Sequence, residues 1–321
     1  MTDVLLVSLG GTTGLREADA ELAASLRRAG ATVEVAAARP ARELRTFALH
    51  ELGWALAARR AAMAGIAAHR PRAVLYSSVT AALLAPRAGA IRFDAPAAGN
   101  RPGRHGIWQR PVERRRLASA TLLVPWSEGG LAEAPRPHAD AVVVPVPVSR
   151  SGPLGERDIA AITYGANPVK KGLAHVLAAW RAARREDETL AVAGLSRPDA
   201  PGVRYVGPLP RDEYRSLLRR ARVFVTAPAR EDYGIAQLEA LADGCALVTT
   251  PAPGPYAALS LARELDPRLV SDTLAIRTAL DDPVPGYADR AASLLAPFAP
   301  AAVDEVVAAQ LLPRLIRTAA G

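Results

Sequence analysis

The sequence predicts an α/β protein with two doubly wound, parallel-sheet domains. Three observations lead there: short β-branched runs alternate with helical patterns, a proline-rich stretch interrupts the alternation, and 321 residues are enough for two cores. The interruption contains Pro145, Pro147 and Pro153. Proline lacks an N–H and ends regular structure. We therefore expect one domain at 1–150 and a second at 151–298.

Apolar, β-branched runs identify the strands, and apolar residues spaced three or four apart identify the helices. In the first half we expect strands at 4–8, 32–37, 73–77, 90–93, 122–125 and 141–144, with helices at 16–28 and 46–69. In the second half we expect strands at 158–164, 190–193, 203–206, 223–225 and 246–249, with helices at 169–184, 211–220 and 234–243. Such alternation builds right-handed βαβ units, whose ligands bind beyond the carboxyl ends of the strands.

The composition is that of a globular protein, with 50% apolar and 22% charged residues. A single cysteine, Cys245, excludes an internal disulfide framework. No basic region precedes the first apolar run, and no stretch is long enough to cross a bilayer. We expect a cytoplasmic protein, and the net charge of +8 does not by itself select a partner.

The chain contains only two lysines, Lys170 and Lys171, and the other 38 of its 40 Lys and Arg residues are arginines. The two lysines stand just before Gly172 and an apolar helical pattern. A helix start carries partial positive charge and disfavours further cations unless an anion binds there too. This pair therefore indicates an anion site, against the alternative of two solvated lysines.

Two further loops follow strands and precede helices. Residues 9–14 read LGGTTG, and their glycines allow backbone amides to approach a phosphate at the helix start, although a plain tight turn fits equally well. Residues 228–244 hold Glu231 in a loop and Glu239 two turns inside a nearly apolar helix. A carboxylate buried there needs hydrogen-bond donors, which sugar hydroxyls would supply. The alternative is a carboxylate in water or paired with an arginine.

This third loop resembles the signature of retaining nucleotide-sugar glycosyltransferases of family 4. Glu231 and Glu239 flank seven residues that include Tyr233 and Gly234, and 239–244 reads EALADG. Lys171-Gly172 at a helix start resembles the family's Lys-Gly segment, and VGPLP at 206–210 resembles the segment beside its nucleotide base. The resemblance is strong in the second half of the chain and loose in the first.

The resemblance implies a GT-B fold: an acceptor domain at 1–150, a donor domain at 151–298, and a last helix within 299–321 that crosses back to the first domain. It implies a donor site in which Lys171 contacts the diphosphate, Glu231 the sugar hydroxyls and Glu239 the ribose. Backbone amides of Gly234 and Ile235 would face the sugar or phosphate, and Gly14 would approach the diphosphate from the first domain. The remaining implied contacts, to the base, are Gly207 and Leu209.

Two positions depart from the family pattern. Ala166 stands where members usually carry an arginine, so Lys170 or Arg230 is expected to replace that cation. Asp94 stands where the family tends to carry a histidine near the donor sugar, and we assign it that catalytic position beside Lys171 and Glu231. His105 lies nearby in the sequence, and we interpret it as a loop residue.

We expect a metal-independent, retaining glycosyltransferase without a cofactor, because no Asp-x-Asp motif of the metal-dependent class occurs. The acceptor is unknown. The six arginines in 101–116 suit an anionic or lipid-linked acceptor, or simply a solvated surface. The stretch 44–66 fits peripheral contact with the inner membrane face, but packing on a sheet is the preferred interpretation.

Parts of the sequence suggest three other functions. A glycoside hydrolase is rejected because its two carboxyl groups flank the scissile bond, whereas Glu231 and Glu239 share one helix end. A catalytically silent nucleotide-sugar-binding protein would explain Ala166 and Asp94. A basic nucleic-acid-binding α/β protein is the third alternative, and no nucleic-acid partner is expected.

Overall fold

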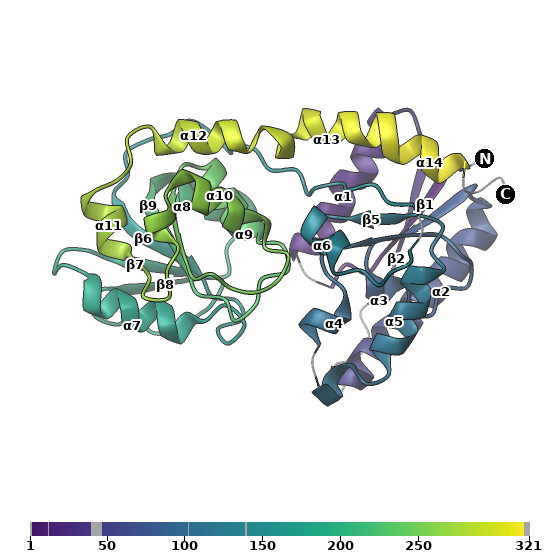
Figure 1. Cartoon of the computed structure of the whole chain (residues 1–321), viewed down its shortest axis with the longest axis horizontal. Coiled ribbons are helices and arrows are strands. Elements are labelled where there is room, and N and C mark those ends of the chain that lie inside the picture. Colours follow the sequence, from purple (N-terminus) through teal and green to yellow (C-terminus); the bar gives the residue numbers. More distant parts are fainter. Residues whose placement is uncertain (1, 12, 40–46, 102, 139, 318–321) are drawn as a thin grey trace. The chain divides into compact units, whose positions relative to one another are not determined.

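The computed structural model describes residues 2–317 except 12, 40–46, 102 and 139, and it leaves out the side chains of 13, 47, 48 and 105 (Figure 1). Position 12 of the glycine-rich loop, positions 44–46 of the predicted helical stretch, and the His105 side chain thus lie outside the described residues. The chain forms two compact units. Unit 1 comprises Met1–Pro147 together with Pro300–Gly321, and unit 2 comprises Val148–Ala299.

Unit 1 is built on a five-stranded parallel sheet with strand order β2-β1-β3-β4-β5. Its strands are β1 (Val4–Ser8), β2 (Val33–Ala37), β3 (Ala73–Tyr76), β4 (Ala90–Phe93) and β5 (Leu123–Pro125). Its helices before the crossing into unit 2 are α1 (Thr13–Arg28), α2 (Phe47–His69), α3 (Val79–Ala82), α4 (Ala97–Asn100), a 3₁₀ turn (Gly103–Gly106), α5 (Gln109–Ala118) and α6 (Glu128–Ala132).

Each face of this sheet packs against helices in a separate apolar cluster. On one face, α2 contributes Ala55, Ala58 and Ala62 to a cluster with Leu5 and Tyr76 of the sheet. On the other face, α1 packs together with the C-terminal helical segment: α13 (Pro300–Val306), a π-helical turn (Val307–Leu311) and α14 (Leu312–Arg317). The alternating pattern along the strands thus corresponds to two buried layers.

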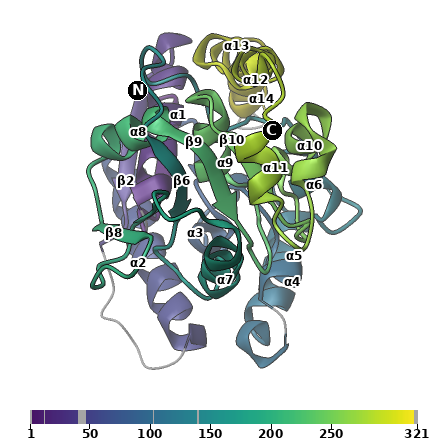
Figure 2. The same cartoon turned by 90° about the vertical axis from the view of Figure 1, so that its left-hand side faces the viewer.

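Unit 2 repeats the architecture with strand order β10-β9-β6-β7-β8, again all parallel (Figure 2). The strands are β6 (Ile159–Tyr164), β7 (Leu190–Ala193), β8 (Val203–Gly207), β9 (Ala221–Thr226) and β10 (Ala246–Thr249). The helices are α7 (Leu173–Ala183), α8 (Arg211–Arg220), α9 (Ile235–Ala242), α10 (Ala257–Leu265), α11 (Ile276–Asp281) and α12 (Tyr287–Leu294), with 3₁₀ turns at Pro267–Leu269 and Ala296–Phe298.

The strand order places the two charged loops of unit 2 side by side. β6 pairs directly with β9, although four elements of the chain separate them. The order reverses at this pair, which is the topological switch point where doubly wound sheets bind ligands. The loop after β6 carries the two lysines and the loop after β9 carries Glu231, so the fold brings them to one end of the sheet.

The predicted strand at 141–144 and the predicted starts of two helices were wrong. Residues 141–144 form only one isolated bridge, to Leu123. The segment runs beside β5, but Pro145 and Pro147 have no N–H with which to continue a ladder. Helix α1 begins at Thr13, so Gly14 lies in its first turn instead of a loop. Helix α7 begins at Leu173, because Gly172 adopts a left-handed conformation at φ +61°.

The preferred interpretation of 44–66 is confirmed over its described part, since α2 packs on the sheet. The opposite face of α2 exposes Leu49, Leu56 and Met63, which are 51%, 40% and 51% accessible. Among the described residues, no helix combines the length and the apolar character needed to cross a membrane.

Candidate functional site

Gly172 presses the lysine loop of unit 2 against the end of β9. A Cβ atom at this position would lie 1.8 Å from the carbonyl oxygen of Ala227, so no other residue fits without moving the backbone. The N–H of Ala229 donates to the carbonyl of Lys170 at 3.2 Å and joins the two loops. Backbone contact of this kind holds the lysine side chains over the loop that contains Glu231.

Lys171 and Glu231 form the closest ion pair of this loop region, with 2.6 Å between Lys171 Nζ and Glu231 Oε2. The lysine side chain is 19% exposed and the glutamate side chain is 6% exposed. Gln237 Nε2, from the first turn of α9, donates to the same carboxylate oxygen at 2.9 Å. Two of the three predicted catalytic groups, Lys171 and Glu231, are therefore in direct contact.

Asp232 forms ion pairs with the other two cations of the site. Lys170 Nζ lies 3.3 Å from Asp232 Oδ2, and Arg230 Nε lies 2.8 Å from Asp232 Oδ1. Together with the Lys171–Glu231 pair, three cations thus face two carboxylates. The surplus positive charge is suited to an anion, and both predicted substitutes for the missing arginine, Lys170 and Arg230, lie in this cluster.

The N-terminus of α9 begins beside this cluster. Gly234 adopts φ +91°, and a Cβ atom there would lie 2.8 Å from Tyr256 Cε2. No side chain caps the helix, and the amide of Leu238 donates to the carbonyl of Gly234. Gly254 carries a similar constraint, since its Cβ would meet the carbonyl oxygen of Glu231 at 2.3 Å. Close packing thus leaves the amide end of α9, where Ile235 is the first residue, near Glu231.

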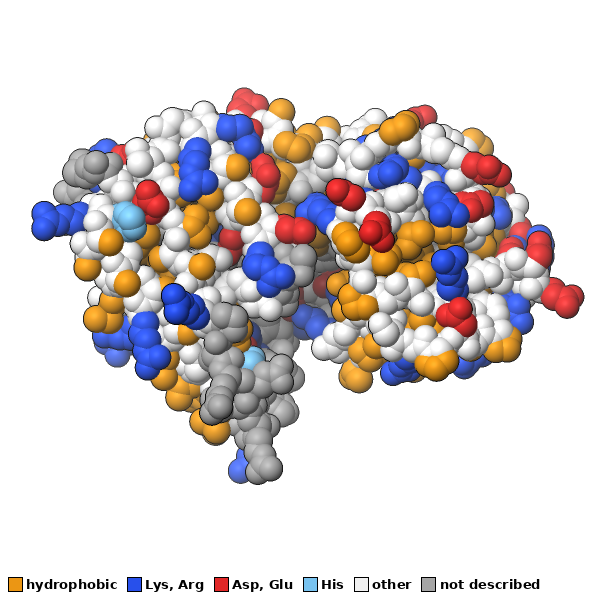
Figure 3. Space-filling view, turned by 180° about the vertical axis from the view of Figure 1, so that it is seen from behind, with side chains coloured by type: hydrophobic (Ala, Val, Ile, Leu, Met, Phe, Trp, Pro, Cys, Tyr) orange, Lys and Arg blue, Asp and Glu red, His pale blue; other side chains and the backbone are white. Residues whose placement is uncertain are grey.

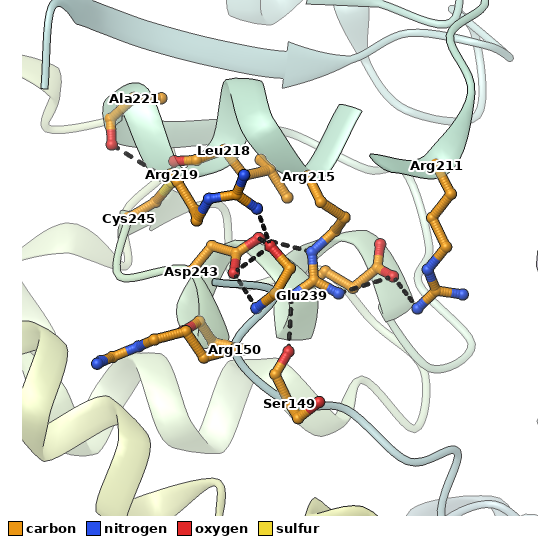
Figure 4. A network of polar contacts seen from close by, with 12 residues as sticks. Ser149, Arg150, Arg211, Arg215, Leu218, Arg219, Ala221, Glu239, Asp243 and Cys245 are labelled. Carbon is orange, nitrogen blue, oxygen red and sulfur yellow. Dashed lines mark hydrogen bonds and ion pairs between the residues drawn. The ribbon is translucent and has the colours of Figure 1, made fainter. Parts of the chain in front are cut away.

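Glu239 lies deeper in unit 2 and is held by arginines (Figure 4). Arg211 Nη2 lies 2.8 Å and Arg215 Nη1 3.4 Å from Glu239 Oε1. The Glu239 side chain is 8% exposed. The alternative of a carboxylate paired with an arginine is therefore confirmed for Glu239, and that of a carboxylate in water is wrong. The contact with sugar hydroxyls stays a prediction.

Arg215 continues the network into the protein interior. Its Nε donates to Asp243 Oδ2 at 2.6 Å and its Nη2 donates to the Ser149 carbonyl at 2.7 Å. Asp243 also accepts from the Ser151 amide and hydroxyl at 2.8 and 2.9 Å. Burial alone would lower the pKa of Arg215, but its bond to Asp243 and the charge of Glu239 raise it, so the guanidinium stays charged.

Gly207 and Leu209 lie in the loop that leads from β8 into α8. Gly207 is the last residue of β8 and has φ +70°. Its carbonyl accepts from the Gly194 amide at 2.8 Å, which joins the ends of β7 and β8. Leu209 is half-buried, and Arg211 begins α8 two residues later. The ion pair between Arg211 and Glu239 connects this predicted base-binding loop to Glu239.

The remaining predicted site residues, Gly14 and Asp94, belong to unit 1. Asp94 directly follows β4, and its Oδ1 accepts from the Ala95 amide at 2.8 Å. Gly130 packs tightly here, since its Cβ would lie 2.5 Å from the Asp94 carbonyl oxygen. Both residues occupy carboxyl-end positions of their sheet, Asp94 after β4 and Gly14 in the helix after β1.

Sequence reasoning missed an acidic cluster around Asp94. Glu113 accepts from the Ala97 amide at 2.6 Å, and Glu51 accepts from Arg101 at 3.2 Å and Gln109 at 3.1 Å. Burial raises the pKa of Glu113 to about 7, and the negative charges of Asp94 and Glu51 add to the effect. The acidic residues come from α2, α5 and the loop after β4, and no spacing in the sequence brings them together.

Sequence reasoning also missed the partners of the two site carboxylates in unit 2, namely Gln237, Arg211 and Arg215. One signal was present: α8 carries Arg211 and Arg215 four residues apart, and Glu239 of α9 has the same spacing from Asp243, the residue that caps the end of that helix. Residues at i and i+4 share one helix face. Two such faces of opposite charge predict a helix-to-helix ion-pair network. Over the described residues, no group of three or more His, Cys, Asp or Glu side chains is arranged to hold a metal ion.

Comparisons with known proteins agree with this geometry. Residues 159–280 match the family model of glycosyl transferases group 1. No curated protein matches the chain significantly by sequence. Sucrose-phosphate synthase from Thermosynechococcus elongatus has a similar structure, with TM-score 0.70 and 14% identity over 99% of this chain and 100% of that one.

Two further solved structures are comparable. WaaG, a glycosyltransferase involved in lipopolysaccharide biosynthesis, has TM-score 0.68 and 14% identity over 95% of this chain and 99% of that one. The trehalose-6-phosphate protein from E. coli bound with UDP-2-fluoro glucose has TM-score 0.67 and 11% identity over 97% and 99%. The predicted fold class is confirmed: the chain has the GT-B fold of two parallel-sheet α/β domains, and its second unit contains the segment that matches glycosyl transferases group 1.

Proposed function

We propose that the protein is a retaining glycosyltransferase, which moves a sugar from a nucleoside diphosphate sugar to an acceptor hydroxyl without a metal ion or a cofactor. The observation that carries the proposal is the cluster at the switch point of unit 2. There Lys171, Glu231 and the uncapped start of α9 meet, and positive charge exceeds negative charge. A nucleoside diphosphate sugar offers a diphosphate for the cations and hydroxyls for the carboxylate.

The reaction breaks the bond between the anomeric carbon and the diphosphate oxygen, and the electron pair leaves with the diphosphate. Lys171 and the amides at the start of α9 stabilise that developing charge, because preorganised donors need no reorganisation. A new bond forms between the same carbon and the acceptor oxygen, whose proton leaves with the departing diphosphate or to solvent. Glu231 accepts from the sugar hydroxyls, with Lys171 and Gln237 holding its carboxylate. Asp94 is assigned to the donor sugar from unit 1.

Donor binding uses the rest of the predicted residues. Glu239 accepts from the ribose hydroxyls, and Arg211 makes room for them because its side chain is 43% exposed. Gly207 and Leu209 contact the base, Lys170 and Arg230 support the diphosphate, Gly234 and Ile235 provide amides, and Gly14 contacts the diphosphate from the start of α1.

For the acceptor, we propose an anionic or lipid-linked molecule and a cytoplasmic protein that contacts the inner membrane face. The exposed Leu49, Leu56 and Met63 follow one another at seven-residue intervals along α2, and Arg59 and Arg60 are exposed beside them. Such a stripe with flanking cations suits the surface of an anionic bilayer.

A second candidate, a silent nucleotide-sugar-binding protein, is favoured by one observation. Ala166 is exposed and adds no cation at the end of β6, and Lys171, Lys170 and Arg230 all face carboxylates. The nucleic-acid alternative has less support. On the face shown in Figure 3, basic and acidic side chains are interspersed, whereas nucleic-acid binding favours a continuous basic stripe.

A thermal-shift panel tests the proposal first. We expect one nucleoside diphosphate among ADP, GDP, CDP and UDP, and its sugar, to raise the melting temperature of the intact chain, since a ligand of the folded state stabilises it. An enzyme should release free nucleoside diphosphate from the donor when an acceptor is added, whereas a silent binding protein should not. A chain that responds to none of the four, yet is retained on DNA at low salt and released by high salt, would contradict the proposal.

A further inference from the structure

We propose that Arg215 is a positioning residue that keeps Glu239 aimed at the ribose of the donor. The inference rests on the proposed function, because Arg215 holds Glu239, which the proposed function assigns to the ribose. Arg215 reaches Glu239, Asp243 and the Ser149 carbonyl with its three guanidinium nitrogens (Figure 4). The Arg215 guanidinium thus links the Glu239 carboxylate to Asp243 and to the backbone at Ser149.

The two arginines that contact Glu239 differ in how easily they can move. The Arg211 side chain is 43% exposed, and water can replace Glu239 as its partner. The Arg215 side chain is 5% exposed, and leaving Glu239 would also break its bonds to Asp243 and Ser149. When ribose hydroxyls reach Glu239, Arg211 is therefore the cation that yields, and Arg215 is the one that stays.

The buried charges depend on each other. Glu239 and Asp243 are 8% and 0% exposed, and Asp243 follows Glu239 by one helical turn, at the C-terminal cap of α9. Two buried carboxylates repel each other and have lost their hydration. A cation between them offsets both costs. Arg215 occupies that place with bonds of 2.6 Å to Asp243 and 3.4 Å to Glu239. Without it, the Glu239 carboxylate would turn toward Arg211 and solvent.

Asp243 is anchored in turn to the segment by which the chain enters unit 2. The amide and hydroxyl of Ser151 both donate to it, and Arg150 Nε donates to the Ala242 carbonyl at 3.4 Å. The amide of Val148 donates to the Phe298 carbonyl at 2.8 Å, which joins the entering segment to the leaving one within unit 2. These contacts make the position of Arg215 a property of the folded unit and not of α8 alone.

The test measures how well the protein distinguishes ribose from deoxyribose. For whichever of ADP, GDP, CDP and UDP binds tightest, dissociation constants are compared with those of its 2′-deoxy and 3′-deoxy counterparts. The original chain should prefer the ribose form by about tenfold, as expected for one hydrogen bond to a charged group. Arg215→Met keeps the length of the side chain but removes the cation. In this variant the preference for ribose over deoxyribose should fall from about tenfold to threefold or less.

Three further variants separate positioning from folding. Arg220→Met removes an arginine of the same helix that pairs with Asp158, away from Glu239, and should keep the tenfold ratio. Asp243→Asn should reduce the ratio while leaving the charge of Arg215 in place, which covers the case in which Arg215→Met does not fold. Arg215→Met combined with Glu239→Gln should show no further loss of the ratio beyond either single variant.

The outcomes are distinct. A folded Arg215→Met or Asp243→Asn variant that binds all nucleotides more weakly, but keeps the tenfold preference, would overturn the positioning role and show a merely structural one. No nucleotide binding by the original chain would instead defeat the proposed function. Loss of the preference in both variants, with Arg220→Met unchanged, supports the inference.

Discussion

The carboxyl ends of the two sheets carry acidic side chains in opposite surroundings. In unit 2, Glu231 faces Lys171 and Glu239 faces Arg211 and Arg215. In unit 1, Glu51 pairs with Arg101, and burial together with the negative charges of Asp94 and Glu51 raises the pKa of Glu113 to about 7. One unit pairs its carboxylates with cations, whereas in the other burial raises the pKa of a carboxyl group to about 7.

The difference shows how one fold can serve two purposes. Paired charges with a cationic surplus suit an anionic ligand such as a diphosphate. A buried acidic cluster instead suits groups that donate hydrogen bonds, such as hydroxyls, and resists a second anion. The two arrangements predict that substitutions in unit 2 change how strongly an anionic ligand is bound. Substitutions in unit 1 should instead change how the stability of the protein depends on pH.

The largest effect is expected for Lys171→Ala. Turnover should fall about a hundredfold or more, because the variant removes a preorganised cation from the developing charge on the leaving group. Release of nucleoside diphosphate is the measurement. Lys170→Ala is the matched control, and its loss should stay below about tenfold, since that side chain is 49% exposed and its charge is screened. Unchanged turnover in Lys171→Ala would defeat the assigned role.

Glu113→Gln should change how stability depends on pH. The pKa of Glu113 rises from 4.5 unfolded to about 7 in the folded protein, mainly through burial. Protonated Glu113 therefore favours the folded state below pH 4.5, and this contribution is lost as the pH rises through 7, by about 3 kcal/mol.

Glutamine stays neutral, so the variant should gain stability relative to the original chain between pH 4.5 and 8. Urea unfolding at both pH values measures the gain, and Glu156→Gln, at an exposed position, is the control. An equal difference at the two pH values would contradict the raised pKa.

Glu239→Gln should weaken nucleoside diphosphate binding about tenfold, which corresponds to about 1.4 kcal/mol. The amide keeps the shape of the side chain but loses the charge that strengthens its bonds to ribose hydroxyls. Turnover at saturating donor should change little, because the ribose is remote from the reacting carbon. Titration calorimetry gives the affinity, and an unaltered dissociation constant would exclude Glu239 as the ribose contact.

The smallest effect is expected for Ala166→Arg, which would add a cation at an exposed position beside the lysine loop. Donor affinity should improve about threefold, as is usual for a solvent-screened charge, and the gain should shrink at high salt. Ala166→Gln has a similar length without charge and should give no gain. Weaker binding by the arginine variant would show that this position does not face the diphosphate.

The sequence alone was sufficient for most of the fold. The strands at 190–193 and 246–249 and the helix at 211–220 have the predicted bounds, because their signals are local periodicities of apolar residues. The meeting of Lys171 with the Glu231 loop also followed from local pattern, since alternating strands and helices place such loops at one end of a sheet.

Only the tertiary structure decided which groups the buried side chains contact. The cation that holds Glu239 lies 24 residues earlier in the chain, and the raised pKa of Glu113 requires its burial beside Asp94 and Glu51, which come from the loop after β4 and from α2. Burial and pairing depend on distances between segments remote in sequence, and those distances are set by packing. A residue pattern identifies which groups carry charge, but packing determines whether each charge meets an opposite charge, a like charge or water.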